Sequence, residues 1–162
     1  LGREHPIVAA DLAALAAIVD GQGRHDEAES MYVRALEIFE RALGPDHYEV
    51  AVNLNNLAGI RQAQGRTAEA EGLYRRSLRI KEAVFGPDHP DVALTLNNLG
   101  LLLADAGRLD EAEALYARAL RTFEACLPHD HPKVRGCAGN YGALKRQRAK
   151  GKGQVLRSRS RS

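Results

Sequence analysis

The chain has 162 residues, of which 44% are hydrophobic and 27% are charged. This composition is that of an ordinary globular domain and excludes the disordered and membrane-spanning classes. No apolar run approaches the roughly 20 residues that cross a bilayer, and the first residues lack the charged and then apolar pattern of a signal peptide, so we expect a cytoplasmic protein.

The charges are distributed unevenly along the chain. Residues 1–130 contain all 21 acidic residues and 13 of the 23 lysines and arginines, while residues 131–162 contain the other ten basic residues and no acid. The two cysteines, Cys126 and Cys137, lack the spacing of a zinc or redox motif, and we expect them to be reduced thiols.

A repeat of 42 residues runs through the sequence. The units that begin at Pro45 and at Pro87 are identical at 21 of 42 positions. Such a period is typical of solenoids, in which each unit is one supersecondary element. The residues that recur at this interval include His5, His47, His89 and His131, and Val8, Val50, Val92 and Val134.

The first helix of each unit is predicted to begin just after the recurring histidine. A proline often stands there, where a helix does not need its first N–H group. A glycine at constant phase is expected to end this helix, because glycine adopts a positive φ without a steric clash. The prolines are Pro6, Pro90 and Pro132, and the glycines are Gly23, Gly65 and Gly107.

The second helix of each unit is predicted to open with acidic residues such as Asp26, Glu69 and Asp110, which favour the positive end of the helix dipole. It ends at a connector that reads Leu-Gly-Pro-Asp-His at 43–47 and Phe-Gly-Pro-Asp-His-Pro at 85–90. The chain itself begins within a connector, so we expect it to be part of a longer array.

Each first helix carries an apolar stripe that is expected to pack on the second helix. Four positions share an arc of about 100° on the helix surface. One of them is small, which lets the second helix approach closely. The stripe comprises Leu12, Leu15, Ala16 and Val19 in the first unit, Leu54, Leu57, Ala58 and Arg61 in the second, and Leu96, Leu99, Gly100 and Leu103 in the third.

Together these residues resemble the tetratricopeptide repeat (TPR), and Leu54-Asn-Asn-Leu-Ala58, Leu73-Tyr74 and the Gly-Pro-Asp-His-Pro connector are similar to the long repeats of kinesin light chains. The resemblance implies an all-α TPR α-solenoid, a right-handed superhelix of antiparallel helix pairs with three full repeats and a C-terminal capping helix. The expected array spans 1–149, with repeats at about 5–44, 47–86 and 89–128 and a last helix at 131–149. Residues 150–162 are expected to form a basic, flexible tail.

The resemblance also implies a binding site, since the face of the first helices opposite the apolar stripe lines the concave groove in which TPR arrays bind peptides. Amide side chains suit this role, because each offers two donors and one acceptor to an extended backbone. The alternative is that some of these amides hydrogen-bond to the neighbouring helix pair. The candidate groove residues are Asn55, Asn56, Gln62, Asn97, Asn98, Leu101 and Asn140.

Two arginines are candidates for anion contacts, Arg61 at the edge of the groove and Arg146 in the fourth helix. For Arg61, and for Lys81 at the position of Phe39 and Phe123, we expect the stem to pack while the charge reaches water, and the anion contact is the alternative for Arg61. Basic residues are otherwise sparse on this face, and Ala13 and Ala17 stand where TPRs that bind acidic chaperone tails carry Lys and Asn.

No catalytic residue is predicted, because the chain has no phosphate-binding loop, nucleophile motif or acid and base pair. The connector period accounts for His131 in the string His129-Asp-His131, so we expect no metal and no cofactor.

The sequence thus indicates a module without enzymatic activity that binds a peptide or protein in its groove. Two alternatives remain open. One is a structural spacer that self-associates by end-to-end stacking, and the other is salt-sensitive association of nucleic acid with the basic tail.

Overall fold

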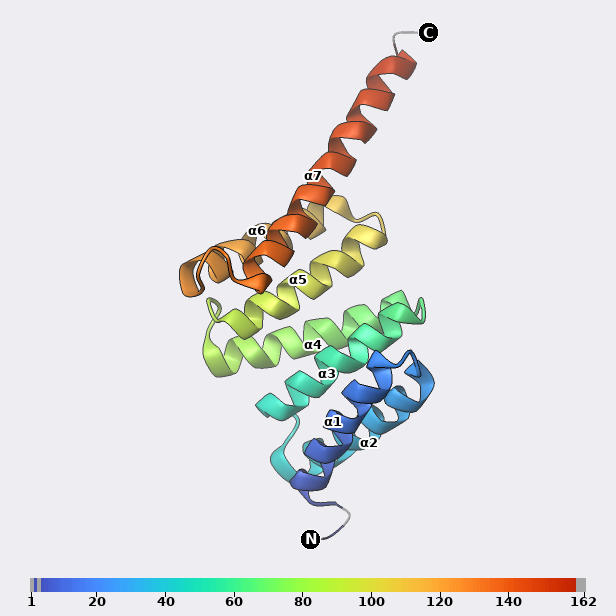
Figure 1. Ribbon diagram of the computed structural model, residues 1–162, viewed down its shortest axis with the longest axis vertical. Coiled ribbons are helices and arrows are strands. Elements are labelled where there is room, and N and C mark those ends of the chain that lie inside the picture. Colours follow the sequence, from blue (N-terminus) through green and yellow to red (C-terminus); the bar gives the residue numbers. More distant parts are fainter. Residues whose placement is uncertain (1, 3, 160–162) are drawn as a thin grey trace. The chain divides into compact units, whose positions relative to one another are not determined.

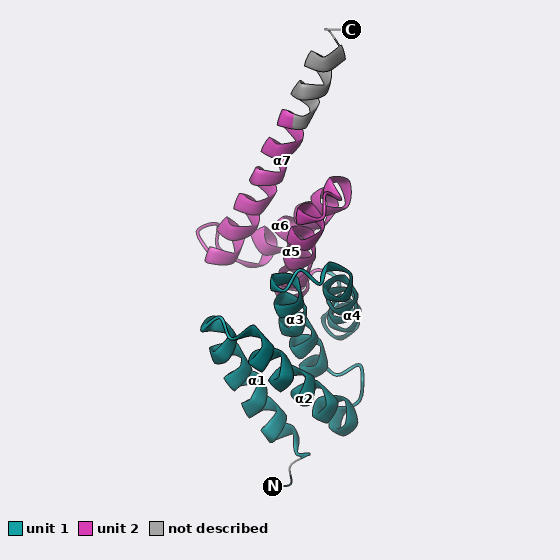
Figure 2. Ribbon diagram, turned by 90° about the vertical axis from the view of Figure 1, so that its right-hand side faces the viewer, with its two compact units in different colours: residues 1–87 teal, residues 88–162 magenta. Residues whose placement is uncertain are grey.

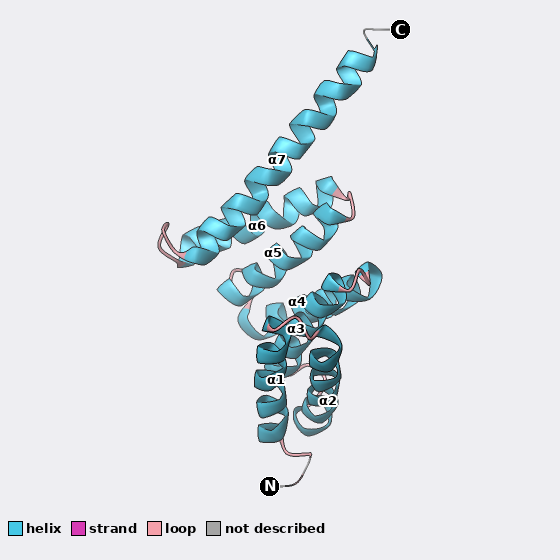
Figure 3. Ribbon diagram, turned by 45° about the vertical axis from the view of Figure 1, so that its right-hand side comes forward, coloured by secondary structure: helices cyan, strands magenta, loops and turns pink. Residues whose placement is uncertain are grey.

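The computed structural model describes the backbone of residues 2 and 4–159, and the side chains of these residues as far as Lys150. Within this part of the chain there are seven helices and no strand (Figures 1 and 3). The helices are α1 (Pro6–Gly21), α2 (His25–Leu43), α3 (Tyr48–Ala63), α4 (Thr67–Phe85), α5 (Pro90–Asp105), α6 (Leu109–Cys126) and α7 (Pro132–Arg159).

The helices form two compact units, residues 1–87 and residues 88–162 (Figure 2). In unit 1, α1 pairs with α2 and α3 pairs with α4, while α2 also packs on α3. In unit 2, α5 pairs with α6, and α6 packs on α7. The sequence predicts a single array over 1–149, whereas the structure divides at the connector that follows α4.

The recurring histidine of each connector is the N-cap of the helix that follows it. The Nδ1 atom of His5 accepts a hydrogen bond from the backbone N–H of Ile7 at 3.2 Å, and His47 does the same for Glu49 at 3.2 Å. His89 and His131 accept equivalent bonds at 3.1 Å. Because the first N–H groups of a helix have no partner within the helix, this cap gives the histidine a structural reason to recur.

The turns between paired helices have one geometry in all three repeats. Gly23, Gly65 and Gly107 have φ values of 78°, 74° and 78°, in the left-handed region that favours glycine. The next residue is an arginine whose guanidinium pairs with a glutamate three residues later. These pairs are Arg24 with Glu27, Arg66 with Glu69, and Arg108 with Glu111.

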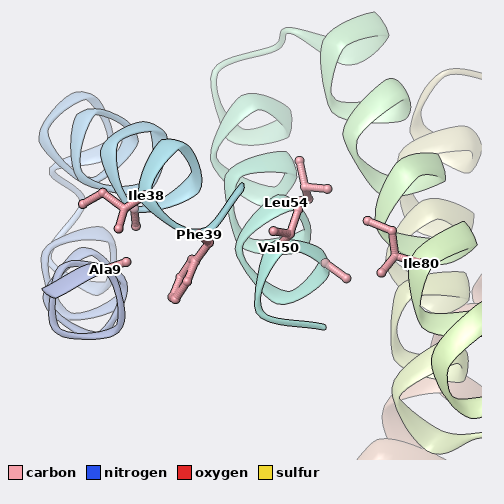
Figure 4. Packing of buried hydrophobic residues seen from close by; sticks show 8 residues of the cluster. Ala9, Ile38, Phe39, Val50, Leu54 and Ile80 are labelled. Carbon is pink, nitrogen blue, oxygen red and sulfur yellow. The ribbon is translucent and has the colours of Figure 1, made fainter. Parts of the chain in front are cut away.

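The core of unit 1 is built from side chains of all four of its helices. Figure 4 shows Ala9 of α1, Ile38 and Phe39 of α2, Val50 and Leu54 of α3, and Ile80 of α4, all of which are buried. A second cluster lies nearer the turns and includes Ala16, Tyr32, Leu57 and Ile60.

The predicted small residue of the apolar stripe has a clear partner in unit 2. A Cβ atom at Gly100 would lie 3.0 Å from Cε1 of Tyr116 on the paired helix α6. Gly100 therefore allows the tyrosine ring to lie against the backbone of α5. Ala16 and Ala58, at the same position in unit 1, are fully buried.

Three expectations about single elements are wrong. Leu15 is 47% exposed, although its equivalents Leu57 and Leu99 are buried. Lys81 is only 3% exposed and has a polar partner, so its charge does not reach bulk water.

The third wrong expectation concerns α7. The sequence predicts a helix that ends at 149 and a flexible tail over 150–162, whereas α7 continues to Arg159. Residues 150–159 contain no proline, and four of these ten residues are Lys or Arg, which have high helix propensity, although Gly151 and Gly153 oppose it. The part of the predicted tail at 160–162 lies outside the described residues.

Candidate functional site

The predicted groove residues lie on the first helices of the pairs, and the structure places them in two sets. Unit 1 holds Asn55, Asn56, Arg61 and Gln62 on α3, and unit 2 holds Asn97, Asn98 and Leu101 on α5 with Asn140 and Arg146 on α7. We refer to these two surfaces as the amide face of unit 1 and the amide face of unit 2.

The amide face of unit 1 is tied to the second helices by its own hydrogen bonds. The hydroxyl group of Tyr74 on α4 donates to Oε1 of Gln62 at 3.2 Å. The side chain of Asn56 hydrogen-bonds to the hydroxyl group of Tyr32 on α2. Burial raises the pKa of Tyr32 and outweighs this hydrogen bond, which lowers it. Asn55 is half-buried and also has a polar partner. For Asn56 and Gln62 the structure therefore supplies partners in neighbouring helices.

The amide face of unit 2 combines an amide pair with an exposed leucine. Nδ2 of Asn140 on α7 donates to Oδ1 of Asn97 on α5 at 3.1 Å. This bond joins α5 to α7, each of which is the first helix of its repeat. Leu101, one helical turn after Asn97, is 40% exposed. Asn98 is half-buried and has a polar partner, and Arg146 is exposed. The structure thus brings together Asn97, Asn140 and Leu101.

Arg61 lies within a cluster of charges that the sequence does not reveal. Nη2 of Arg61 is 2.9 Å from Oε1 of Glu29, and Nη1 pairs with Glu69. Glu29 also accepts from Arg66 at 2.8 Å and from Gln64 at 2.9 Å. The side chain of Arg61 is 18% exposed and its guanidinium contacts two carboxylates, so an external anion would have to compete with them.

The carboxylate of Glu29 shows the effect of this cluster on its pKa. Burial raises the pKa of Glu29, while hydrogen bonds from Gln64 and Arg66 and the charges of Arg61 and Arg66 lower it, and the net result is a lowered pKa. The carboxylate is therefore held in its ionised form.

Two buried polar residues that the sequence analysis missed join consecutive pairs. Nδ2 of Asn53 on α3 donates to the carbonyl oxygen of Tyr32 at 2.7 Å, and the thiol of Cys137 on α7 donates to the carbonyl oxygen of Tyr116 at 3.8 Å. Burial raises the pKa of Cys137 to about 11, so this thiol stays protonated. Both donors follow their acceptors by 21 residues, half of the repeat, and this spacing is the signal that could have identified them.

A shallow surface pocket of about 390 Å³ lies in unit 1, and its lining contains none of the candidate groove residues. Its lining comes from the turn between α1 and α2 and from the end of α3, and it includes Arg24, His25, Asp26 and Gln64. These groups already pair, since Arg24 binds Glu27, His25 lies 2.7 Å from Asp20, and Gln64 donates to Asp26 at 3.0 Å. The pocket offers no set of unpaired groups for chemistry.

The described residues also bear on metal binding and on membrane insertion. None of their His, Cys, Asp and Glu side chains gather in a group of three that could hold a metal ion. Among the same residues, none of the helices combines the length and the apolar character needed to span a membrane.

Many solved structures are similar to this chain. BtubC (BKLC) from P. vanneervenii is 25% identical with a TM-score of 0.81, over 98% of this chain and 66% of BtubC. A putative kinesin light chain with nearly identical TPR-like repeats from Podosopora anserina is 21% identical with a TM-score of 0.73, over 99% of this chain and 77% of that one. At 21% identity, the similarity to the Podosopora anserina protein supports the fold alone.

The type III secretion translocator chaperone SycD of Yersinia enterocolitica is more distant. It is 18% identical with a TM-score of 0.66, over 86% of this chain and 85% of SycD. No curated protein sequence matches this chain.

The family model of the tetratricopeptide repeat matches residues 8–83, 49–125 and 92–150, which overlap and together cover most of the sequence. The helix pairs, their capped starts and their glycine turns agree with that match. The chain belongs to the tetratricopeptide repeat family and has its all-α fold.

Proposed function

We propose that this chain binds a peptide or an extended segment of a protein along the first helices of its repeats, and that it catalyses no reaction. TPR proteins generally act in protein–protein interactions, and chaperones are among the similar structures. The observation that carries the proposal is the amide face of unit 2, where Asn97 and Asn140 meet beside the exposed Leu101.

The chemistry of this face suits a backbone as ligand. An asparagine amide has two N–H donors and an oxygen acceptor, and the Asn97–Asn140 bond uses only one N–H and part of one oxygen. The remaining groups can pair with the N–H and C=O groups of a bound segment, while Leu101 can pack against one apolar side chain of it. Because the face carries few charges apart from Arg146, we propose a neutral or weakly charged ligand in preference to an acidic one.

The location is also a proposal. Cys126 and Cys137 are both free thiols, which is usual in a reducing compartment. We propose the cytoplasm on this ground.

The Asn55→Ala, Asn97→Ala double variant is expected to weaken partner binding about tenfold or more, because each lost hydrogen bond contributes roughly 0.5–1.5 kcal/mol. The measurement is affinity capture from an extract of the source cells with the intact chain and with the variant, followed by titration of the proteins whose recovery differs. Helix content should stay unchanged, and the melting temperature should fall only slightly, because the Asn97–Asn140 hydrogen bond is lost.

The matched control is Ser30→Ala with Glu124→Ala, two exposed positions on α2 and α6. This pair should bind as the unmodified chain does. Equal recovery with the asparagine variant and the control would remove the asparagines from the proposed site.

A further inference from the structure

The outer face of α1, which we define as Ile7, Asp11, Leu15 and Ile18, is apolar and open to solvent. These residues share one side of the helix at about 100° per residue. Ile7 is 51% exposed, Leu15 is 47% exposed and Ile18 is 61% exposed. Adjacent large apolar side chains at this exposure are typical of an interaction surface.

The repeat itself shows what such a face does elsewhere in the chain. The residues of α3 that are equivalent to Leu15 and Ile18 are Leu57 and Ile60, which are 2% and 1% exposed in a cluster with Tyr32 of α2. On α7 the equivalent of Ile18 is Leu144, which is 2% exposed. In both cases a preceding second helix packs on this face.

Asp11 distinguishes the outer face of α1 from its equivalents. Two of the three corresponding residues, Asn53 and Cys137, each donate a hydrogen bond to a carbonyl oxygen of the helix packed on them, while Thr95 donates to Asp91 of its own helix. An ionised aspartate has no hydrogen to donate, and burial against a carbonyl oxygen would leave its charge uncompensated. A helix that packs in the same way as α2 or α6 is therefore a poor occupant, and a helix with a positive charge opposite Asp11 is a good one.

A symmetric pairing of two α1 helices is disfavoured for the same reason. Asp11 lies near the middle of the apolar face, so an antiparallel pair would bring two carboxylates close together in an apolar surrounding. Like charges in such an environment repel strongly.

The chain has a suitable cationic surface on α7, formed by Ala138, Tyr141 and Lys145. Nζ of Lys145 lies 4.0 Å from the centroid of the Tyr141 ring, and Lys145 and Ala138 are exposed. Their equivalents on α5, Leu103 and Leu96, are buried. This surface thus combines an aromatic ring, a small residue and a positive charge, and the described part of α7 has no acidic residue.

We propose that the outer face of α1 docks on the α7 surface of a second copy of the chain. Asp11 pairs with Lys145 of the second copy, while Ile7, Leu15 and Ile18 pack around Tyr141 and Ala138. The two surfaces differ, so a pair leaves the α7 surface of one copy and the outer face of α1 of the other unoccupied. Such a heterologous contact continues into longer assemblies unless it closes into a ring.

The test is sedimentation of the intact chain from about 1 µM to about 1 mM, a range that covers the affinity of a small interface. The average mass should rise with concentration, and it should rise less at high salt because the Asp11–Lys145 pair is screened. Ile18→Lys and Asp11→Asn should each weaken the assembly about tenfold. Val84→Lys, at a position of α4 that is 48% exposed, is the matched control and should leave the mass unchanged.

A charge exchange makes the test specific. Asp11→Lys alone and Lys145→Glu alone should both weaken the assembly, whereas the double variant should restore it, because the pair is then reversed. Tighter assembly of Asp11→Asn would instead indicate an α1–α1 pair, and a mass that stays monomeric at all concentrations would exclude self-association. Either result would overturn the proposal.

Discussion

Replacement of Phe39 by alanine is expected to lower the free energy of unfolding by about 3–5 kcal/mol, the range for large aromatic residues in a core. Phe39 is 3% exposed and lies in the cluster with Ile38, Val50, Leu54 and Ile80 (Figure 4). Its side chain contributes to the cluster that joins α1, α2, α3 and α4, so the cavity left by alanine would affect the whole of unit 1. Urea unfolding followed by circular dichroism measures this change.

The control for Phe39→Ala is Val84→Ala, at an apolar position that is 48% exposed. A substitution at such a site usually changes stability by no more than about 0.5 kcal/mol. Equal effects at the two positions would show that the Phe39 cluster does not hold unit 1 together.

Replacement of Glu29 by alanine is expected to destabilise the chain by about 1–3 kcal/mol, because it leaves partly buried donors without their acceptor. Glu29 is 17% exposed and binds Arg61, Arg66 and Gln64, and so links α2 to α3 and to the turn before α4. Glu69 still pairs with both arginines in the variant, which keeps the loss below that of a fully buried ion pair. Urea unfolding at neutral pH measures the change.

The same contacts predict a dependence on pH. The pKa of Glu29 is lowered in the folded state, so protons bind more tightly to the unfolded chain. The stabilisation is complete above the ordinary pKa of 4.5 and is lost as the pH falls through the folded-state value. The difference between the unmodified chain and Glu29→Ala should therefore shrink below pH 4.5, and a constant difference at all pH values would exclude a role for the charge of Glu29.

The pairing of helices could be predicted from the sequence because the repeat places the same signals in every unit. Proline after the connector histidine, glycine at the turn and a small residue opposite a tyrosine each have a local physical reason. The histidine recurs as regularly as the glycine. Its function as an N-cap, however, depends on a hydrogen bond that the backbone N–H two residues later donates to Nδ1. That geometry becomes clear only when the helix start is known.

The exposure of single residues could be predicted less well, since it depends on which helix covers which face. The repeat pattern predicts that Leu15 and Leu57 are both buried. Leu57 is covered by α2, whereas no second helix precedes α1 within the described residues. Lys81 is equivalent to Phe39 and Phe123 in the other two repeats. All three residues are buried.

The sequence predicts on which helices the candidate groove residues lie. It does not predict which of their polar groups are already engaged in hydrogen bonds within the chain. The spacing of 42 residues correctly places the amides on first-type helices. It does not show that Asn140 donates to Asn97, that Tyr74 donates to Gln62, or that Glu29 and Glu69 pair with Arg61. These partners lie 43, 12, 32 and 8 residues away in sequence, and their contacts depend on how the helices pack.

The most direct test of the binding proposal is photocrosslinking from the amide face of unit 2. A benzophenone amino acid is placed at Leu101, which is 40% exposed on α5, and at the exposed Ala114 on α6 as the matched position on a second helix. Binding along the first helices predicts that irradiation in an extract of the source cells links specific proteins to position 101 and not to position 114. Equal labelling at both positions, or labelling at 114 alone, would contradict it.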